Sequence, residues 1–232
     1  MSGSIYTDGS YLRRNPTWHA EDSRWKADHV FEILRKNRIA PMTVCEVGYG
    51  AGEVLHQLHG LMPDNVTFSG YEISPQAYEM ARPKSKDRLS YHLKDLLEER
   101  DARFDVVLVI DVLEHVEDIY GFLRGLHPKG RHAVFHIPLD LSVYSVLRTT
   151  HIIDERRRTG HIHYFTKETA LATLRDAGYE ILDHYYTASA VELPRATLKE
   201  NLARYPRRVL YKVNADLTVK LLGGYSLIVL AR

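Results

Sequence analysis

The sequence predicts an α/β fold: a doubly wound, mostly parallel sheet of seven strands, with helices on both faces and an antiparallel hairpin at the C-terminal edge. A glycine-rich turn, 48–52, joins an apolar run to a segment with helical spacing. Strand-like and helix-like segments then alternate, which is typical of a parallel sheet covered on both faces. The last two strand-like segments, 179–186 and 225–231, are expected to pair as antiparallel edge strands with an insertion at the tip of their hairpin.

Each expected element has a local reason in the sequence. The expected strands are 42–45, 66–73, 89–93, 104–110, 132–137, 179–186 and 225–231. The expected helices are 54–58, a helix starting at 74–75, one through 119–123, and 166–177. Segment 104–110 contains the apolar run 106–110, which suits a strand buried on both faces. Pro75 suits a first helical turn, and Thr166 is a good N-cap with Glu168 in the first turn.

The domain prediction is one domain over 1–232, with an N-terminal lid or helix over 1–40. Two insertions, 139–160 with one short helix and 194–222 with basic, helical character, interrupt the alternation. Both are expected on the side of the binding site that would receive the substrate. A chain of this length can bury a sizeable core.

Composition excludes several classes. The formal net charge is +1, so nothing global draws the chain to nucleic acid or to a membrane. Cys45 is the only cysteine, which indicates a buried thiol and a reducing compartment. No apolar run has membrane-spanning length, and the first residues lack a signal-peptide pattern. A cytoplasmic protein that acts without nucleic acid or membrane is expected, while its oligomeric state stays open.

The acids around the glycine-rich turn indicate the ligand. A dinucleotide loop reads G-x-G-x-x-G, whereas this one reads G-x-G-x-G, and Glu53 stands where the third dinucleotide glycine would fall. Glu46 lies two residues before the first glycine. Two carboxylates would repel a pyrophosphate, but they suit the ammonium and sulfonium of S-adenosylmethionine (SAM). The carboxylate of SAM could still bind the loop N–H groups.

With these motifs the sequence resembles the class I SAM-dependent methyltransferases of the small-molecule type, over roughly 43–180. The segment 46–52 resembles the first motif of the family, with Glu46 in place of the usual Asp, and 111–116 resembles the fourth motif. Pro128-Lys129-Gly130 resembles the usual turn before the fifth strand. The resemblance implies a Rossmann-like fold and SAM as cofactor, with S-adenosylhomocysteine (SAH) as product.

The resemblance also implies a set of cofactor-binding residues: Glu46, Gly48, Gly50, Gly52, Glu72, Ile73, Asp95, Leu96 and Asp111. Glu72 falls where an acid binds both ribose hydroxyls, and Asp95 falls where an acid commonly bonds the adenine amino group. Each position has a structural alternative. Glu72 could be a solvated strand end, Asp95 could merely cap a helix, and Asp111 has capping-box spacing to Glu114.

Histidines are the candidates for the chemistry, because methyl transfer to an alcohol or ammonium requires the loss of a proton. His115 follows the fourth strand at the carboxyl edge of the sheet, and His163 precedes a helix; both are predicted catalytic residues, although a purely structural His115 is an equal alternative. His136, at the end of the fifth strand, is a further histidine at this edge. His161 and His163 could bind metal, but no acid or third histidine visibly completes the set, so no metal is expected.

Two charged or aromatic segments suggest roles at the site. Segment 15–26 contains both tryptophans and a histidine. Such a segment could form a lid over the cofactor, or it could belong to a helix that Trp25 anchors to the core by packing. The basic runs in 155–158 and 204–212 are either solvated faces or contacts for an anionic acceptor.

Together these features predict SAM-dependent methyl transfer to a small-molecule acceptor, with O-methylation of a sugar or other hydroxylated metabolite as the first reading. N-methylation of an amine and a non-catalytic SAM-binding sensor or partner protein are the alternatives. A dehydrogenase is disfavoured by Glu53.

Overall fold

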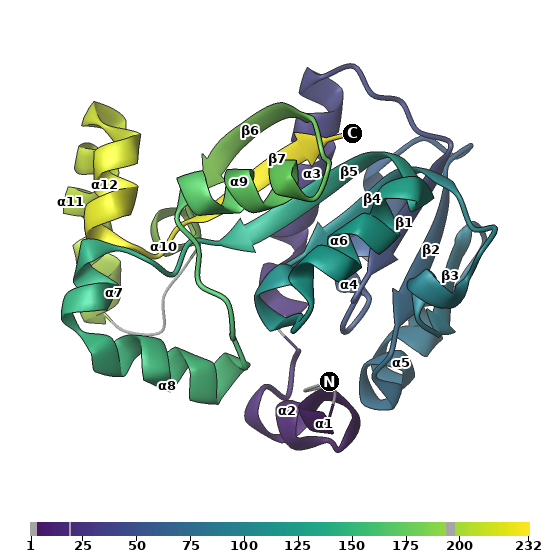
Figure 1. Cartoon of the computed structure of the whole chain (residues 1–232), viewed down its shortest axis with the longest axis horizontal. Coiled ribbons are helices and arrows are strands. Elements are labelled where there is room, and N and C mark those ends of the chain that lie inside the picture. The colour runs from purple at the N-terminus through teal and green to yellow at the C-terminus, as the bar shows by residue number, and fades with distance from the viewer. Residues whose placement is uncertain (1–3, 19, 194–197) are drawn as a thin grey trace.

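The computed structural model describes residues 4–18, 20–193 and 198–232. His19 of the tryptophan-rich segment and the first four residues of the insertion 194–222 lie outside the described residues. Seven strands form one sheet in the order β3-β2-β1-β4-β5-β7-β6, with helices on both faces, so the predicted fold class is confirmed (Figure 1). The strands are β1 (Thr43–Val47), β2 (Thr67–Glu72), β3 (Leu89–Leu93), β4 (Phe104–Ile110), β5 (Gly130–Pro138), β6 (Ile181–Thr187) and β7 (Ser226–Ala231).

Strand β7 is antiparallel to both of its neighbours, β5 and β6, whereas the pairs among β1 to β5 are parallel. The predicted antiparallel pair at the edge of the sheet is therefore present. However, β7, the last strand in the sequence, lies between β5 and β6, and β6 forms the edge. The unbroken apolar run of β7, with five of its residues buried, fits the interior position.

The helices are α1 (Ser4–Thr7), α2 (Ser10–Arg14), α3 (Ser23–Lys36), α4 (Glu53–Leu61), α5 (Pro75–Ala81), α6 (Ile119–Leu126), α7 (Val143–Leu147), α8 (Thr149–Thr159), α9 (Lys167–Asp176), α10 (Ser189–Glu192), α11 (Leu198–Val213) and α12 (Ala215–Leu222). The expected caps are present: Ser74 accepts from the Ala77 N–H before α5, and Thr166 accepts from the Thr169 N–H before α9.

The core consists of two layers, one on each face of the sheet. Val107 and Val109 of β4 face the layer that contains α6 and α9. Val106 and Leu108 face the layer that contains α3 and α4. This alternation explains why residues 106–110 of β4 are all apolar, because both faces of the strand are covered.

The chain reverses its direction of winding between β1 and β4. Strands β2 and β3 follow β1 toward one edge, whereas β5 lies beyond β4 toward the other. Open α/β sheets bind ligands outside the carboxyl ends of the strands at such a reversal. The glycine-rich turn after β1 and the Asp111 segment after β4 lie at this point.

The insertions and the N-terminal segment lie outside the sheet. Segment 139–160 holds two helices, α7 and α8, where one short helix was expected. In Figure 1, α7, α8, α11 and α12 form a lobe on the left, and α1 and α2 lie below the sheet. Across the described residues, no helix is both long and apolar enough to cross a membrane.

Candidate cofactor and acceptor site

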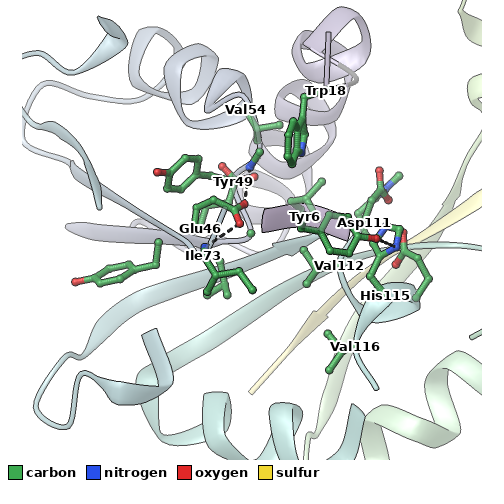
Figure 2. Close-up of a pocket in the computed structure, with 18 of the residues that line it drawn as sticks. Tyr6, Trp18, Glu46, Tyr49, Val54, Ile73, Asp111, Val112, His115 and Val116 are labelled. Carbon is green, nitrogen blue, oxygen red and sulfur yellow. Dashed lines mark hydrogen bonds and ion pairs between the residues drawn. The ribbon is translucent and has the colours of Figure 1, made fainter. Parts of the chain in front are cut away.

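A cavity of about 850 Å³ opens at the carboxyl ends of β1, β2 and β4. Its walls come from the N-terminal segment, from the loops that follow the first four strands, and from the end of α8. The predicted site residues that line it are Glu46, Gly48, Gly50, Glu72, Ile73, Asp95, Leu96, Asp111 and His115. In Figure 2, Glu46 and Ile73 lie toward one end of the drawn pocket and Asp111 and His115 toward the other.

The glycine-rich turn approaches its neighbours too closely for side chains. Gly50 has a φ of 54°, and a Cβ there would lie 2.6 Å from the Trp18 ring. Gly48 has a φ of 69°, and its Cβ would lie 2.7 Å from a methyl group of Val112. Glycine adopts this backbone without strain, and it has no side chain to keep a ligand away. The N–H groups of the turn can therefore come close to a ligand in the cavity.

Two predicted residues do not line the cavity. Gly52 caps α4 with a φ of 73°, and its carbonyl oxygen accepts a hydrogen bond from the Tyr91 hydroxyl. The Nε2 atom of His163 is hydrogen-bonded to the carbonyl oxygen of Val116 at 2.7 Å. Gly52 thus supports the turn on the side away from the cavity, and we give His163 no role in the reaction.

Glu46 is 2% exposed, and its Oε2 atom has no hydrogen-bond partner among the described residues. Burial raises the pKa of this carboxyl to about 8; Lys26 on α3 opposes the shift, and nearby Glu72 adds to it. Without ligand, Glu46 is therefore mostly protonated at neutral pH. A cationic group beside it would favour the carboxylate.

Glu72 closes β2 and accepts three backbone hydrogen bonds. Its carboxylate accepts from Gly50 N–H at 3.1 Å, from Ile73 N–H at 2.8 Å and from Ser74 N–H at 2.9 Å. The side chain is buried, so the reading of Glu72 as a solvated strand end is wrong. Its carboxylate links the glycine-rich turn to the end of β2.

Asp95 caps a short helical turn and also lies at the cavity. Its side chain accepts from Leu97 N–H at 2.9 Å and thereby caps a short helical turn. The same residue lines the cavity beside Leu96. Capping and a place at the site are compatible here.

Asp111 does not cap a helix, so the capping-box interpretation is wrong. Val112 is the N-cap residue of the turn that contains Glu114, without a side-chain cap. The Asp111 carboxylate instead pairs with Lys26 Nζ at 2.8 Å and with His136 Nδ1 at 2.5 Å. Burial opposes ionisation, but His136 and Lys26 outweigh it and hold the pKa of Asp111 well below its usual range. Its φ of 52° is strained for a non-glycine residue.

His115 belongs to a group of polar side chains beyond Asp111. Its Nδ1 atom is hydrogen-bonded to the Tyr6 hydroxyl at 2.8 Å. Its Nε2 atom lies 3.8 Å from the Oε1 atom of Glu114, and His161 Nε2 lies 3.9 Å from the same oxygen. All four residues line the cavity. The region beyond Asp111 therefore concentrates groups that can accept a proton.

Several lining residues were not singled out from the sequence as binding residues. Tyr6, Lys26 and Glu114 line the cavity, and Arg158 is the member of the first basic run that lines it. A lysine at an otherwise buried position of α3 was a usable signal, because a buried lysine needs a carboxylate partner. The position of Tyr6 had no such signal.

The N-terminal segment contributes both to the cavity wall and to the core. Tyr6, Tyr11, Trp18 and Trp25 line the cavity. Val30, Ile33 and Leu34 of α3 are buried in the core, as their helical spacing indicated. The indole N–H of Trp25 donates to Glu192 at 2.6 Å, so Trp25 connects α3 to α10 rather than entering the core.

Comparisons with known proteins agree with this geometry. A family model described as a methyltransferase domain matches residues 18–184. The ubiquinone biosynthesis O-methyltransferase of Pseudomonas syringae pv. tomato is 27% identical over 207 residues, which cover 76% of this chain and 88% of that protein. The structure of magnesium protoporphyrin IX methyltransferase from Synechocystis with bound SAH matches with a TM-score of 0.60 at 17% identity, covering 90% of this chain and 82% of that one. An N-methyltransferase from Bradyrhizobium japonicum in complex with SAH matches with a TM-score of 0.56 at 16% identity, covering 90% and 86%.

Proposed function

The chain belongs to this methyltransferase family and is a SAM-dependent methyltransferase, and from that premise we propose that it methylates a hydroxyl oxygen of a small hydroxylated metabolite. The observation that carries the proposal is the polar group beyond Asp111. Deprotonation of an alcohol is the step that needs help, and His115, Glu114 and His161 lie together on the cavity wall. The relatives named O-methyltransferases support the same choice.

We assign the cofactor to the end of the cavity near β1 and β2. The Glu72 carboxylate is assigned to the two ribose hydroxyls, and Asp95, Leu96 and Ile73 to the adenine. Glu46 is assigned to the ammonium of the methionine moiety, and the turn at Gly48 and Gly50 to its carboxylate. This orientation directs the methyl group toward Asp111 and His115, so that an acceptor oxygen can approach it in line at about 3 Å.

Binding of SAM is expected to release a proton at about pH 7. The reason is that the ammonium favours the ionised Glu46 carboxylate and so lowers a pKa that is about 8 in the free protein. Calorimetry in two buffers of different ionisation enthalpy measures the release. It should vanish at about pH 9, where Glu46 is already ionised, and in Glu46→Gln. An enthalpy that does not depend on the buffer at about pH 7 would contradict the assignment.

The acceptor is assigned an anionic group. Arg158, at the end of α8, lines the cavity on the side of His161 and Thr159. Its guanidinium suits a phosphate or carboxylate on the acceptor. All three arginines of this run are exposed, but Arg156 and Arg157 do not line the cavity and fit a solvated face.

N-methylation is the second candidate, because the buried Glu114 carboxyl could hold an acceptor ammonium. The two reactions are distinguished by incubating the protein with SAM and matched acceptors that differ only in a hydroxyl or an amino group. We expect SAH to form with the hydroxyl compounds and the product to carry an O-methyl group by NMR spectroscopy. SAH formation with the amines alone would refute O-methylation.

A further inference from the structure

Glu114 is a buried acid whose carboxylate is not satisfied by the described protein groups around it. Its side chain is fully buried, and neither carboxylate oxygen has a hydrogen-bond partner among the described residues. Buried carboxylates are normally satisfied, because an unpaired one is costly to desolvate. The nearest partners are the Nε2 atoms of His115 and His161, at 3.8 and 3.9 Å, which is beyond hydrogen-bonding distance.

The other nitrogens of the two histidines determine what these Nε2 atoms offer. His161 Nδ1 lies 2.6 Å from the Asp140 carboxylate, which can only accept, so Nδ1 carries the proton. His115 Nδ1 lies 3.3 Å from the carbonyl oxygen of Gly160, which also only accepts, as well as near the Tyr6 hydroxyl. In the neutral His161 ring Nε2 therefore directs a lone pair toward Glu114, and His115 Nε2 does so in the tautomer whose Nδ1–H donates to the Gly160 carbonyl oxygen.

Three side chains that can each donate an electron pair thus converge at one point of the cavity wall. The ligating atoms of Glu114, His115 and His161 all lie within 4.8 Å of one another. Ligands of one ion at about 2.0–2.2 Å are separated by up to about 4.2 Å, so separations of 3.8 and 3.9 Å fit a shared ion. Histidine ligands of metals characteristically hydrogen-bond a carboxylate or carbonyl through their second nitrogen, as both rings do here.

We propose that Glu114, His115 and His161 bind one divalent first-row transition cation, of the zinc or manganese class, at the acceptor end of the cavity. Two imidazoles and one carboxylate suit such ions better than Mg²⁺ or Ca²⁺, which prefer oxygen ligands. No metal was expected from the sequence, because no acid or third histidine visibly completed a set with His161 and His163. The fold supplies Glu114 and His115, and it turns His163 away.

The cation gives the proposed O-methylation its activating group, so this role rests on the proposed function. A hydroxyl oxygen bound at an open coordination position has a lowered pKa and loses its proton to solvent. The oxygen then attacks the methyl carbon, the carbon–sulfur bond breaks, and neutral SAH leaves. The acceptor ends as a methyl ether, and one proton is released per turnover.

The binding test uses the full chain, freed of metal by a chelator and dialysed, with Co²⁺ and Zn²⁺ as probes. We expect one Co²⁺ per chain with visible absorption bands, and displacement by Zn²⁺. Glu114→Gln and His161→Asn should weaken Co²⁺ binding at least about 100-fold, since losing even a hydrogen-bond partner of a ligand costs 10–100-fold. His163→Asn is the matched control and should bind Co²⁺ as the wild type does.

The outcomes separate the cation from the reaction. Absence of stoichiometric Co²⁺ binding, or equal binding by wild type and a folded Glu114→Gln variant, would overturn the cation site. Glu114→Gln keeps the shape of the side chain and removes a buried carboxyl, so its metal-free melting temperature should not fall. Co²⁺ binding by a protein that methylates only amines would retain the site and refute the proposed function.

Discussion

His115→Ala is expected to lower kcat for methyl transfer by about 10²–10⁴-fold while the SAM dissociation constant barely changes. His115 belongs to the group with Tyr6, Glu114 and His161 at the acceptor end of the cavity, away from the assigned adenosine contacts. Its removal deletes the proton acceptor or, where the proposed cation is bound, one of its three ligands. Both losses act on activation of the acceptor rather than on cofactor binding.

The measurement is SAH formation at saturating SAM and acceptor, with SAM affinity measured separately by calorimetry. His59→Ala is a matched control, because His59 bonds the carbonyl oxygen of Asp87 at 2.9 Å and does not line the cavity. If His115 only packed the segment after β4, the melting temperature and SAM affinity would fall together and kcat would remain. Wild-type kcat in a folded His115→Ala variant would remove His115 from the mechanism.

Glu72→Ala is expected to weaken SAM and SAH binding at least about tenfold, because charge-assisted hydrogen bonds contribute roughly 1.5–3 kcal/mol each. The assigned ribose hydroxyls lose their acceptor. In addition, the Gly50 N–H loses the carboxylate to which it donates a hydrogen bond at 3.1 Å, so the glycine-rich turn is less firmly held.

Glu72→Gln separates these two effects. Its amide oxygen can still accept from the backbone, but its amide nitrogen cannot accept from a ribose hydroxyl. We therefore expect Glu72→Gln to retain more of the melting temperature than Glu72→Ala while still weakening SAH binding. An unchanged SAH dissociation constant in a folded Glu72→Ala variant would show that Glu72 does not bind the ribose.

Local patterns were sufficient to predict most of the fold. The apolar run of β4 predicted a strand covered on both faces, and Ser74-Pro75 predicted the start of α5. The position of β7 between β5 and β6 was not predictable. The alternation of apolar and polar residues identifies a segment as a strand, but it does not say which strands will be its neighbours in the sheet. The helices of 139–160 were undercounted because α8 carries a run of charged residues and little apolar periodicity.

The site was predictable where residues adjoin the strands that position them. Glu46, Glu72 and Asp111 each follow or end a strand, so their place at the sheet edge follows from the topology. The ion pair between Asp111 and Lys26 joins residues from distant parts of the chain, and only the packing of α3 brings them to 2.8 Å. The convergence of His161 on Glu114 likewise depends on the backbone bond from Ile162 N–H to the Glu114 carbonyl oxygen.

The central claim is that the glycine-rich turn and its acids bind an adenosyl amino acid rather than a dinucleotide, and titration calorimetry tests it most directly. The purified protein is titrated with SAH and, separately, with NAD⁺. Buried Glu46 favours a ligand with an ammonium and disfavours a pyrophosphate, so we expect one SAH per chain and no heat of binding with NAD⁺. Binding of NAD⁺ with no response to SAH would contradict the account.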